Sequence, residues 1–480
     1  MSLDVRKFTL DNGLTVLFYP RPNLSVFVGY ILAKVGSFNE SPGVSGVSHL
    51  LEHMMFKGTR LLGTLDYESE VPRLEQIDAL AAARLQEQAK LRTCYGGGDP
   101  KRVEELTQQI TALENDLKEL AVPNELWGIY QRHGGTALNA ATGRDSTCYH
   151  VTLPSNKLEM WAFMEADRLQ NAVFREFYSE RDVVSQERLQ RVDNDPSGVL
   201  YEQFYLAFNS GNTYADPLVG WPSDLDTLTR DKVSLYFKEH YAPGNLVLSL
   251  VGDLEFDTVR EVITRYFGAI PAQPAPPPRF LQSVKQYGAK RLEVHLDANP
   301  ELVAGYPGPQ PGHEDQFALI MAAGVLSEGR SSRFYRRLVE SGLAFEAYAY
   351  LQRRAWDSAW CLSLTPQAPH TAQEVLQIAL EEVDKLREQG ASPEEIERVC
   401  NAVRMVEVST LDSPEGLAAA LAYAEAFKGG WEHFNESARL LEVSSADVQR
   451  VLEQYVQPHL MTVAELISST EAEQPAPLAP

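Results

Sequence analysis

The chain has 480 residues, of which 44% are apolar and 23% are charged, a composition typical of a folded globular protein rather than a disordered one. It carries 43 basic and 66 acidic residues, so its formal net charge is −23. Nucleic acids and anionic membrane surfaces attract clustered lysine and arginine, so this charge disfavours both as main partners and favours basic or neutral ligands. No apolar run reaches the length of about 18 residues that a membrane-spanning helix needs, so no membrane span is expected.

The first residues of the chain and its cysteines give information on the cellular compartment in which the protein is expected. The first residues contain no apolar core of the kind found in secretory signal peptides. The sequence as it stands is therefore expected in the cytoplasm, with the periplasm as the alternative if a signal peptide has been removed. Reduced or unpaired thiols, rather than a disulfide framework or a thiolate zinc site, are expected at four scattered cysteines: Cys94, Cys148, Cys361 and Cys400.

The first half of the chain predicts a mixture of strands and helices. Apolar residues alternate over Lys7–Tyr19 around Asn12-Gly13, which is the strongest short signal for a β-hairpin. Further strands are expected over residues 26–35, 138–153 and 246–251, and helices over residues 44–56, 157–170 and 179–192.

Residues 64–122 follow a different pattern, with apolar residues at alternating intervals of three and four. Such spacing places an apolar seam along a helix, where a second helix packs. The glycine-rich stretch 96–100 interrupts the pattern, so the segment predicts an antiparallel helical hairpin. Two interpretations stay open, namely helices packed on the body and a protruding arm that docks another protein. The seam residues are Leu74, Ile77, Ala81, Val103, Leu106, Ile110, Leu113, Leu117 and Leu120.

A proline-rich stretch over residues 271–279 predicts a stiff, extended linker near the middle of the chain. The segments on either side look related, because Ser179–Val183 resembles Ile396–Val399 and Asp231–Pro243 resembles Asp447–Pro458 at nearly constant separations. A near-constant offset supports a duplicated unit. The expected fold class is therefore α+β, with two homologous α/β-sandwich domains that have mostly antiparallel sheets. The expected domains are residues 1–270, with the helical hairpin inserted at about 64–122, and residues 280–470, followed by a tail over 471–480.

The strongest chemical signal is His49-Leu50-Leu51-Glu52-His53, which lies inside a predicted helix. Residues four apart share one face of a helix, so both imidazoles can reach a single metal ion. Glu52 borders the same face, where its carboxylate can hold and deprotonate a metal-bound water molecule. Two histidines and a carboxylate that leave one position for water are the pattern of a catalytic zinc site, and this order is the inverzincin motif. The alternative is a helix with one packed histidine and a solvated Glu-His pair.

The segment around this motif, Gly43–Thr59, resembles the zinc-motif segment of the M16 metallopeptidases, a family that includes pitrilysin, insulin-degrading enzyme and mitochondrial processing peptidase. Later segments of the chain are similar to the same family at Gly134–Thr142, Glu180–Glu187, Tyr241–Asn245 and Val251–Asp253. The resemblance covers nearly the whole chain except the predicted helical hairpin, and it is most specific in the first half. It implies a zinc-dependent endopeptidase.

The resemblance implies a role for each matching residue. His49 and His53 match the two histidine ligands of one zinc ion per chain, and Glu52 matches the general base. Glu187 matches the third ligand, and Glu180 matches an acid that supports a ligating histidine in relatives. Taken without the resemblance, Glu187 is an ordinary solvated glutamate on a helix. The long gap between His53 and Glu187 is explained by the inserted hairpin.

The resemblance also implies a substrate-binding strand at Asn139 and Ala140. In relatives the matching strand lies at a sheet edge, so a peptide substrate is expected to pair with it through main-chain hydrogen bonds. Such pairing recognises extended backbone more than side chains. Taken alone, Asn139 is better explained as a turn or strand-end residue.

The second half of the chain lacks this metal chemistry. Arg404 stands where the repeat offset places the counterpart of Glu187, and no second H-x-x-E-H follows the linker. Active relatives often carry an Arg and a Tyr in a segment that matches Ser332–Phe345, and these two residues donate hydrogen bonds to the substrate carbonyl. Here Val339 and Phe345 stand at those positions, and neither side chain donates a hydrogen bond.

This departure leaves two interpretations. In the first, a related partner chain supplies the Arg and Tyr, so that the protein works as a dimer or as a heterodimer, as some bacterial members of the family do. Alternatively, the donors come from this chain after a shift of register, from Arg336, Arg337, Tyr348 or Tyr350.

Two functions are therefore in competition. The first is a zinc endopeptidase that forms the zinc-bearing subunit of a two-subunit peptidase. The second is a non-proteolytic structural or assembly subunit, because some relatives are subunits of membrane respiratory assemblies. The complete His-His-Glu set with its base favours the first, since structural relatives tend to lose these residues. The net charge adds the expectation that basic peptides are cleaved faster than acidic ones at low salt.

Overall fold

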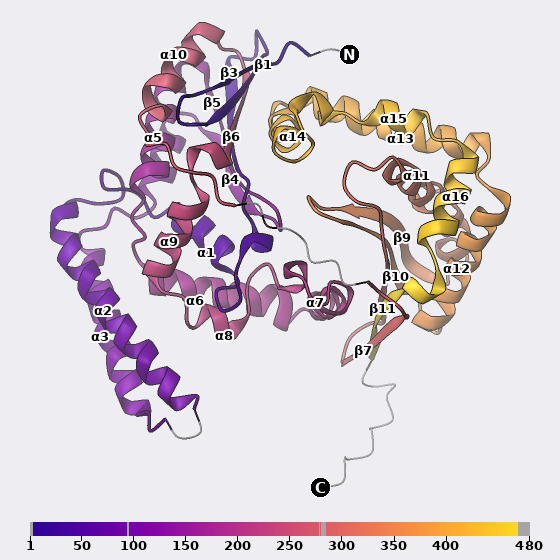
Figure 1. Ribbon diagram of the computed structural model, residues 1–480, viewed down its shortest axis with the longest axis horizontal. Coiled ribbons are helices and arrows are strands. Elements are labelled where there is room, and N and C mark those ends of the chain that lie inside the picture. The colour runs from indigo at the N-terminus through magenta and orange to yellow at the C-terminus, as the bar shows by residue number, and fades with distance from the viewer. Residues whose placement is uncertain (1–2, 94–95, 278, 280–284, 469–480) are drawn as a thin grey trace. The chain divides into compact units, whose positions relative to one another are not determined.

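The structure, a computed structural model, describes residues 3–93, 96–277, 279 and 285–468 (Figure 1). The predicted tail, Cys94 and part of the predicted linker lie outside these residues. The chain forms two compact units, and each includes chain from both sides of the predicted linker, so the domain limits given above stay a prediction. The first unit comprises Met1–Gln186, Pro217–Pro278 and Ser413–Ala426, and the second comprises Glu187–Asp216, Arg279–Asp412 and Phe427–Pro480.

The first unit is built on a six-stranded sheet with the strand order β1-β2-β6-β3-β5-β4. Strands β2 and β6 run parallel, and the other neighbours are antiparallel. The predicted hairpin turns at Asn12-Gly13, where Gly13 has a positive φ of 92°. The strands are β1 (Arg6–Thr9), β2 (Thr15–Pro20), β3 (Val26–Ala33), β4 (Thr136–Thr142), β5 (Thr147–Pro154) and β6 (Leu246–Gly252).

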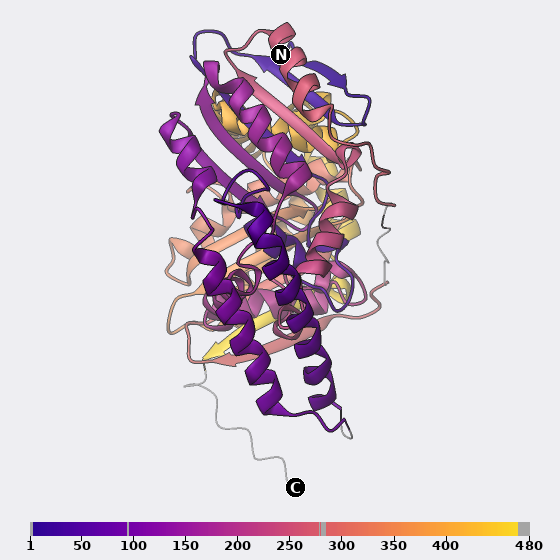
Figure 2. The same ribbon diagram turned by 90° about the vertical axis from the view of Figure 1, so that its left-hand side faces the viewer.

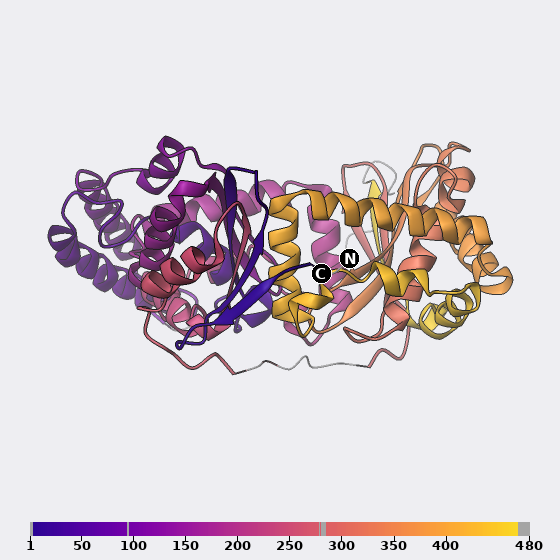
Figure 3. The ribbon, with the colours of Figure 1, turned by 90° about the horizontal axis from the view of Figure 1, so that it is seen from above.

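Helices cover both faces of this sheet (Figure 3). On one face the indole of Trp161, from α5, lies so close to Gly29 of β3 that a side chain at Gly29 would collide with it. On the other face, the Thr152 hydroxyl of β5 donates a hydrogen bond of 2.7 Å to Glu415 of α14. The helices are α1 (Val47–Met54), α2 (Tyr67–Leu91), α3 (Pro100–Lys118), α4 (Glu125–Arg132), α5 (Leu158–Asn171), α6 (Phe177–Arg188), α8 (Pro222–Leu225), α9 (Arg230–His240), α10 (Phe256–Phe267) and α14 (Pro414–Phe427).

Helix boundaries differ from the predicted ones for local reasons. Helix α1 begins at Val47 because the preceding Gly46 has a left-handed backbone, with φ of 83°. Helix α6 ends at Arg188, and Leu189–Asp193 continues it as a π-helical turn. Helix α4 and helix α7 (Pro196–Phe208) of the second unit are among the helices that the sequence pattern did not predict.

Residues 64–122 form the predicted antiparallel hairpin, from α2 and α3, and Figure 2 shows its far end directed away from the rest of the first unit. Along its inner part, the seam residues Leu106, Ile110 and Leu117 are buried. Toward the far ends of both helices most side chains are exposed. The inner part therefore packs as ordinary helices do, and the outer part projects.

The second unit is built on a five-stranded sheet with the order β7-β11-β8-β10-β9. Alternate residues of β8 face opposite cores, since Leu302 packs in the core that includes α11, α12 and α16 whereas Val303 packs against Phe204 of α7. The elements are β7 (Lys290–Leu296), β8 (Glu301–Pro307), β9 (Ala344–Arg353), β10 (Ser358–Pro366), β11 (Thr462–Ser468), α7 (Pro196–Phe208), α11 (Asp315–Ser327), α12 (Ala372–Gln389), α13 (Pro393–Asp412), α15 (Ser437–Leu441) and α16 (Ser445–Tyr455).

The two sheets share one topology. Strands β2-β6-β3-β5-β4 and β7-β11-β8-β10-β9 follow the same order, and each set has one parallel pair followed by three antiparallel pairs. This confirms the predicted α+β fold with two related units. Among the described residues, none of the helices combines the length and the hydrophobicity that a membrane-spanning helix requires. Three of the four cysteines, Cys148, Cys361 and Cys400, form no disulfide.

Candidate metal centre

Helix α1 carries the H-x-x-E-H motif, and a buried glutamate holds its N-terminus. The two carboxylate oxygens of Glu40 accept hydrogen bonds from the backbone N–H of Gly46 at 2.7 Å and of Ser48 at 2.8 Å. The negative charge of Glu40 also lies at the positive end of the helix dipole. The Ser48 hydroxyl shares a hydrogen bond of 2.8 Å with the Tyr236 hydroxyl of α9. These contacts fix the position and rotation of the helix that bears both histidines.

His49, His53 and Glu187 lie together in the structure. One potential ligand atom from each lies within 4.8 Å of the others, and the two imidazole ring centres are 4.9 Å apart. His49 is buried, and the other two are half-buried. Glu187 is on the last turn of α6, and Arg191, one turn later, forms an ion pair of 2.9 Å with its Oε1. Helix α6 thus places a carboxylate that is distant in the sequence beside the two histidines.

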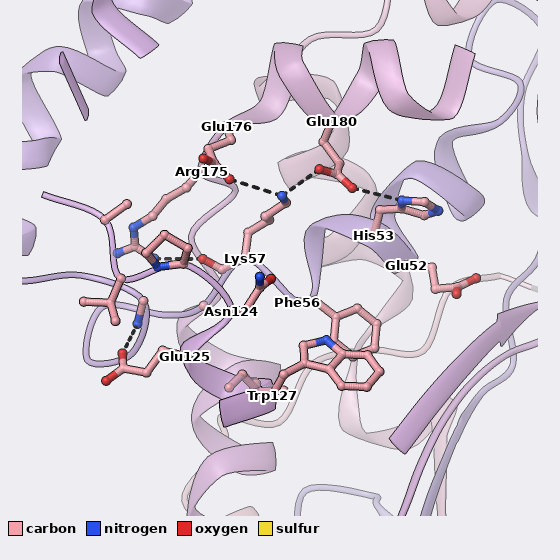
Figure 4. A pocket seen from close by; sticks show the side chains of 16 residues that line it. Glu52, His53, Phe56, Lys57, Asn124, Glu125, Trp127, Arg175, Glu176 and Glu180 are labelled. Carbon is pink, nitrogen blue, oxygen red and sulfur yellow. Dashed lines mark hydrogen bonds and ion pairs between the residues drawn. The ribbon is translucent and has the colours of Figure 1, made fainter. Parts of the chain in front are cut away.

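Glu180, one of the predicted site residues, lies beside His53 (Figure 4). Its Oε1 is 3.1 Å from Nδ1 of His53, and its Oε2 forms an ion pair of 2.6 Å with the ammonium of Lys57. Burial alone would raise the pKa of Glu180, but hydrogen bonds from His53 and Lys57, with the charge of Lys57, outweigh it and lower the pKa to about 2. An ionised carboxylate only accepts hydrogen bonds, so the proton of this contact lies on Nδ1 of His53. In the neutral imidazole, Nε2 then has a lone pair for a metal ion.

Glu52 lies on the same helix and is held by a residue that the sequence analysis did not single out. The Thr142 hydroxyl, at the end of β4, donates a hydrogen bond of 2.6 Å to Oε2 of Glu52. The carboxylate is half-buried and lines a cavity together with His53. The contact ties the predicted general base to the strand on which substrate is expected to bind.

The three predicted ligands fit a zinc ion by their chemistry. Two imidazole nitrogens and one carboxylate oxygen are donors that zinc prefers, and three protein ligands leave one coordination position open. Atoms bound to one zinc ion lie roughly 3.3 Å apart, given the usual bond lengths of a tetrahedral site. The observed separations, all within 4.8 Å, therefore need only small side-chain rotations to close around the ion.

A cavity of about 420 Å³ opens beside Glu52 and His53. The rings of Phe56 and Trp127 lie on one wall, with centroids 5.7 Å apart, as Figure 4 shows. Lys57 also lines the cavity, and its ammonium bridges Glu180, at 2.6 Å, and Glu176, at 3.1 Å. The remaining lining comes mainly from residues 58–63 and 121–126, which flank the helical hairpin. The cavity has room for one large side chain of a bound peptide.

Strand β4, which bears Asn139 and Ala140, is an edge strand of the first sheet. Its residues pair with β5, Asn139 opposite His150 and Ala140 opposite Tyr149. Asn139 is exposed, and its Oδ1 accepts a hydrogen bond of 3.0 Å from the N–H of Ala140. A bulge before Asn139, where Ala137 has a positive φ of 50°, resets the register of the strand that ends beside Glu52.

The positions matched to the Arg and Tyr of relatives lie in the second unit. Val339 is half-buried on the π-helical turn Tyr335–Val339, and Phe345 is 62% exposed on β9. Arg333, just before this turn, makes a two-point ion pair with Glu395 of α13. The alternative donors are Arg336, Arg337, Tyr348 and Tyr350. All of them are exposed except Tyr350, which is half-buried. The choice between these donors and a partner chain stays a prediction.

Four residues that position the site were not predicted from the sequence. These are Glu40, Lys57, Glu114 and Thr142, and three of them act on elements distant in the sequence. Only Glu40 had a local signal, because an acid shortly before a helix is a common partner for the first N–H groups. The other contacts are set by tertiary packing, which the spacing of residues does not report.

The comparison with known proteins agrees with this fold. The family described as Insulinase (Peptidase family M16) matches residues 25–74 and 121–220, and the family described as Peptidase M16 inactive domain matches residues 227–403. Together these matches cover more than half of the chain, and the break between the first two lies in the helical hairpin. The chain belongs to the M16 peptidase family, as the resemblance predicted.

Several relatives carry zinc protease names. The chain is 27% identical over 421 residues to the zinc protease PqqE of Helicobacter pylori, covering 85% of this chain and 81% of that protein. It is 24% identical over 457 residues to an uncharacterized zinc protease of Streptomyces coelicolor, covering 93% and 86%. The crystal structure of a protease from Helicobacter pylori superposes with a TM-score of 0.80 at 25% identity, covering 97% of this chain and 100% of that one.

Proposed function

We propose that this chain is a zinc-dependent endopeptidase that hydrolyses peptide bonds of extended peptides. The observation that carries the proposal is the convergence of His49, His53 and Glu187, with ligand atoms within 4.8 Å of one another, beside a glutamate that Thr142 holds in place. The zinc protease names of the relatives support the same chemistry.

Each residue of the site then has one task. His49, His53 and Glu187 hold one zinc ion, and Glu180 keeps His53 in the tautomer and orientation that the ion needs. The bound ion supplies a Lewis acid that polarises the scissile carbonyl and makes water a stronger nucleophile. Glu52 accepts the proton of the attacking water and delivers it to the leaving amine.

Strand β4 is the element that we propose for substrate binding. It is an edge strand, Asn139 on it is exposed, and its last residue, Thr142, touches Glu52. A peptide added as a further strand beside Asn139 and Ala140 would run toward the general base. One of its side chains then enters the cavity walled by Phe56 and Trp127.

The test measures zinc and cleavage together on the purified chain. The wild type is expected to contain about one zinc ion and to cleave a quenched extended peptide, slowly alone and faster with a related chain that carries the Arg and Tyr, until a chelator removes the metal. Glu52→Gln is expected to keep the zinc and lose the cleavage, because only the proton acceptor is removed. A Glu52→Gln variant that cleaves like the wild type would refute the assignment of the base.

We also propose that the chain is the zinc-bearing subunit of a two-subunit peptidase. Support comes from Val339 and Phe345, which replace a donor pair with two side chains that carry no hydrogen-bond donor. Adding a related chain that carries the Arg and Tyr is expected to raise the cleavage rate sharply. Full activity of the isolated chain would contradict this second proposal and would favour donors from Arg336, Arg337, Tyr348 or Tyr350.

A non-proteolytic assembly subunit is the competing function. The match of residues 227–403 to a family described as an inactive domain favours it for the second half of the chain. A complete set of candidate zinc ligands with its base favours peptidase activity for the first half. A zinc-free chain that cleaves no peptide, alone or with a related chain, would establish the assembly role instead.

A further inference from the structure

The hairpin inserted between the two metal-bearing helices makes buried polar contacts with helix α6. Glu114 of α3 is only 6% exposed, and both of its carboxylate oxygens point at the N-terminus of α6. Its Oε1 accepts a hydrogen bond of 3.0 Å from the backbone N–H of Tyr178, and its Oε2 accepts one of 3.0 Å from the Ser179 hydroxyl. Glu114 thus satisfies donors that a helix N-terminus leaves without intrahelical partners.

The residue that precedes α6 does not make this contact itself. Glu176 has a positive φ of 54°, and its carbonyl accepts the first helical hydrogen bond, from the N–H of Glu180 at 2.9 Å. Its side chain, however, turns away to form an ion pair of 3.1 Å with Lys57. The cap of α6 is therefore supplied from outside the helix, by the inserted hairpin.

A second buried contact ties the hairpin to the segment that follows α1. Glu70 of α2 is 1% exposed and accepts two hydrogen bonds from Nε of Arg175, at 2.8 and 3.1 Å. The guanidinium of Arg175 also donates to the carbonyls of Lys57, Thr59 and Leu62. Because Arg175 lies two residues before α6, one buried ion pair joins the hairpin, the end of the motif segment and the start of α6.

The buried charges of Glu70 and Arg175 are costly unless they stay paired, because losing one partner leaves the other without compensation. Such a pair therefore tolerates less displacement of its two side chains than an apolar contact does. Helix α6 carries Glu180, which meets His53, and ends with Glu187, which lies among the candidate ligands. A rotation or shift of α6 at its start moves both carboxylates relative to the histidines on α1.

We propose that Glu114 is a positioning residue of the metal centre, and that the inserted hairpin sets the place of α6 so that Glu180 and Glu187 reach His53. The inference rests on the zinc site proposed above. The outer part of the hairpin, where most side chains are exposed, takes no part in this role. The insertion is thus a component of the site and not only an appendage of the fold.

The chain offers a matched control for this idea. Asp78 of α2 forms a two-point ion pair with Arg230 of α9, so it anchors the same hairpin to a different helix. Asp78→Asn weakens the attachment of the hairpin but removes neither of the two hydrogen bonds that Glu114 accepts at the N-terminus of α6. A difference between Glu114 and Asp78 variants therefore separates positioning of α6 from general anchoring of the hairpin.

The experiment measures the zinc dissociation constant of the full-length chain by chelator competition, and the absorption spectrum of the cobalt-substituted protein. Glu114→Ala is expected to weaken zinc binding about tenfold or more, as loss of a group that orients ligands does, and to alter the cobalt spectrum. Glu114→Gln keeps the size and one acceptor oxygen, so an intermediate loss is expected. Asp78→Asn is expected to bind zinc within about twofold of the wild type.

The possible results distinguish a failure of the positioning role from a failure of the proposed zinc site. A wild type that binds no zinc overturns the zinc site, and the positioning role with it. If the wild type binds zinc and a folded Glu114→Ala or Glu114→Gln variant binds it equally well, the positioning role alone is overturned. Equal losses of zinc affinity in the Glu114 and Asp78 variants also overturn the positioning role, because such losses show that the hairpin is only anchored in general.

Discussion

The Thr142 hydroxyl donates a hydrogen bond of 2.6 Å to Oε2 of Glu52, so the last residue of the edge strand β4 holds the proposed general base. A short bond to a carboxylate is among the stronger hydrogen bonds in proteins. The contact links the element that is proposed to bind substrate with the group that is proposed to move the proton. Substrate binding on β4 and the orientation of Glu52 are therefore expected to depend on each other.

Replacing Thr142 by Val removes the hydroxyl and keeps the shape of the side chain. We expect kcat for a quenched peptide to fall roughly tenfold, because Glu52 gains rotational freedom and loses a hydrogen bond. Zinc content is expected to stay at the wild-type level, and Thr142→Ser should restore most of the rate. Unchanged kcat in Thr142→Val would show that the contact does not orient the base.

Replacing Glu180 by Ala removes the carboxylate that meets Nδ1 of His53. Loss of such a partner typically lowers metal affinity 10- to 100-fold, so we expect a loss of about that size for zinc. Glu176→Ala is the matched control, since Glu176 also pairs with Lys57 but makes no contact with His53 in the described structure. Equal zinc affinities in the two variants, measured by chelator competition, would rule out a specific role for Glu180.

The pair of Arg333 and Glu395 predicts a pH-dependent stability of the second unit. Burial alone would raise the pKa of Glu395, but hydrogen bonds and the charge of Arg333 outweigh it and leave the pKa below its ordinary value. A carboxylate with a lowered folded-state pKa stabilises the fold above its unfolded pKa, and this contribution is lost as the pH falls through the folded pKa.

Glu395→Gln is therefore expected to lower the free energy of unfolding by about 1 kcal/mol at pH 7, since the pair is two-pointed but partly exposed. The difference from the wild type should stay constant above the ordinary glutamate pKa of about 4.3, shrink as the pH falls below it, and vanish once the pH is below the lowered folded-state pKa. Urea unfolding at several pH values measures it. A difference that grows as the pH falls would contradict the assigned direction.

The net charge of −23 predicts a preference among substrates. Four glutamates against two basic residues line the cavity beside Glu52 and His53. We expect kcat/KM for basic peptides to exceed that for acidic peptides of equal length at low salt, and the ratio to fall as salt screens the field. Equal rates at all salt concentrations would show that the charge serves solubility alone.

The sequence predicted those features of the fold that depend on local patterns. The turn at Asn12-Gly13, the paired helices of residues 64–122 and the i, i+4 histidines follow from spacing, because neighbours in sequence decide them. The shared topology of the two sheets was expected only from a weak repeat. The family resemblance supplied Glu180 and Glu187, which no spacing rule would have chosen.

The remaining features depend on contacts between distant segments. Glu114 caps a helix that begins 63 residues later, and Thr142 reaches Glu52 across 90 residues of chain. Such partners are chosen by the packing of whole elements, so the residue types alone do not reveal them. The same reason hides the buried pair of Glu70 and Arg175, whose charges look like solvated surface residues in the sequence.

The most direct measurement of the central claim is X-ray absorption at the zinc edge of the purified chain, with metal content measured on the same sample. We predict about one zinc ion per chain, bound by two imidazoles and at least one carboxylate oxygen, with the ion lost in His53→Ala and in Glu187→Ala. A chain without zinc, or a zinc ion bound without imidazole, would contradict the account.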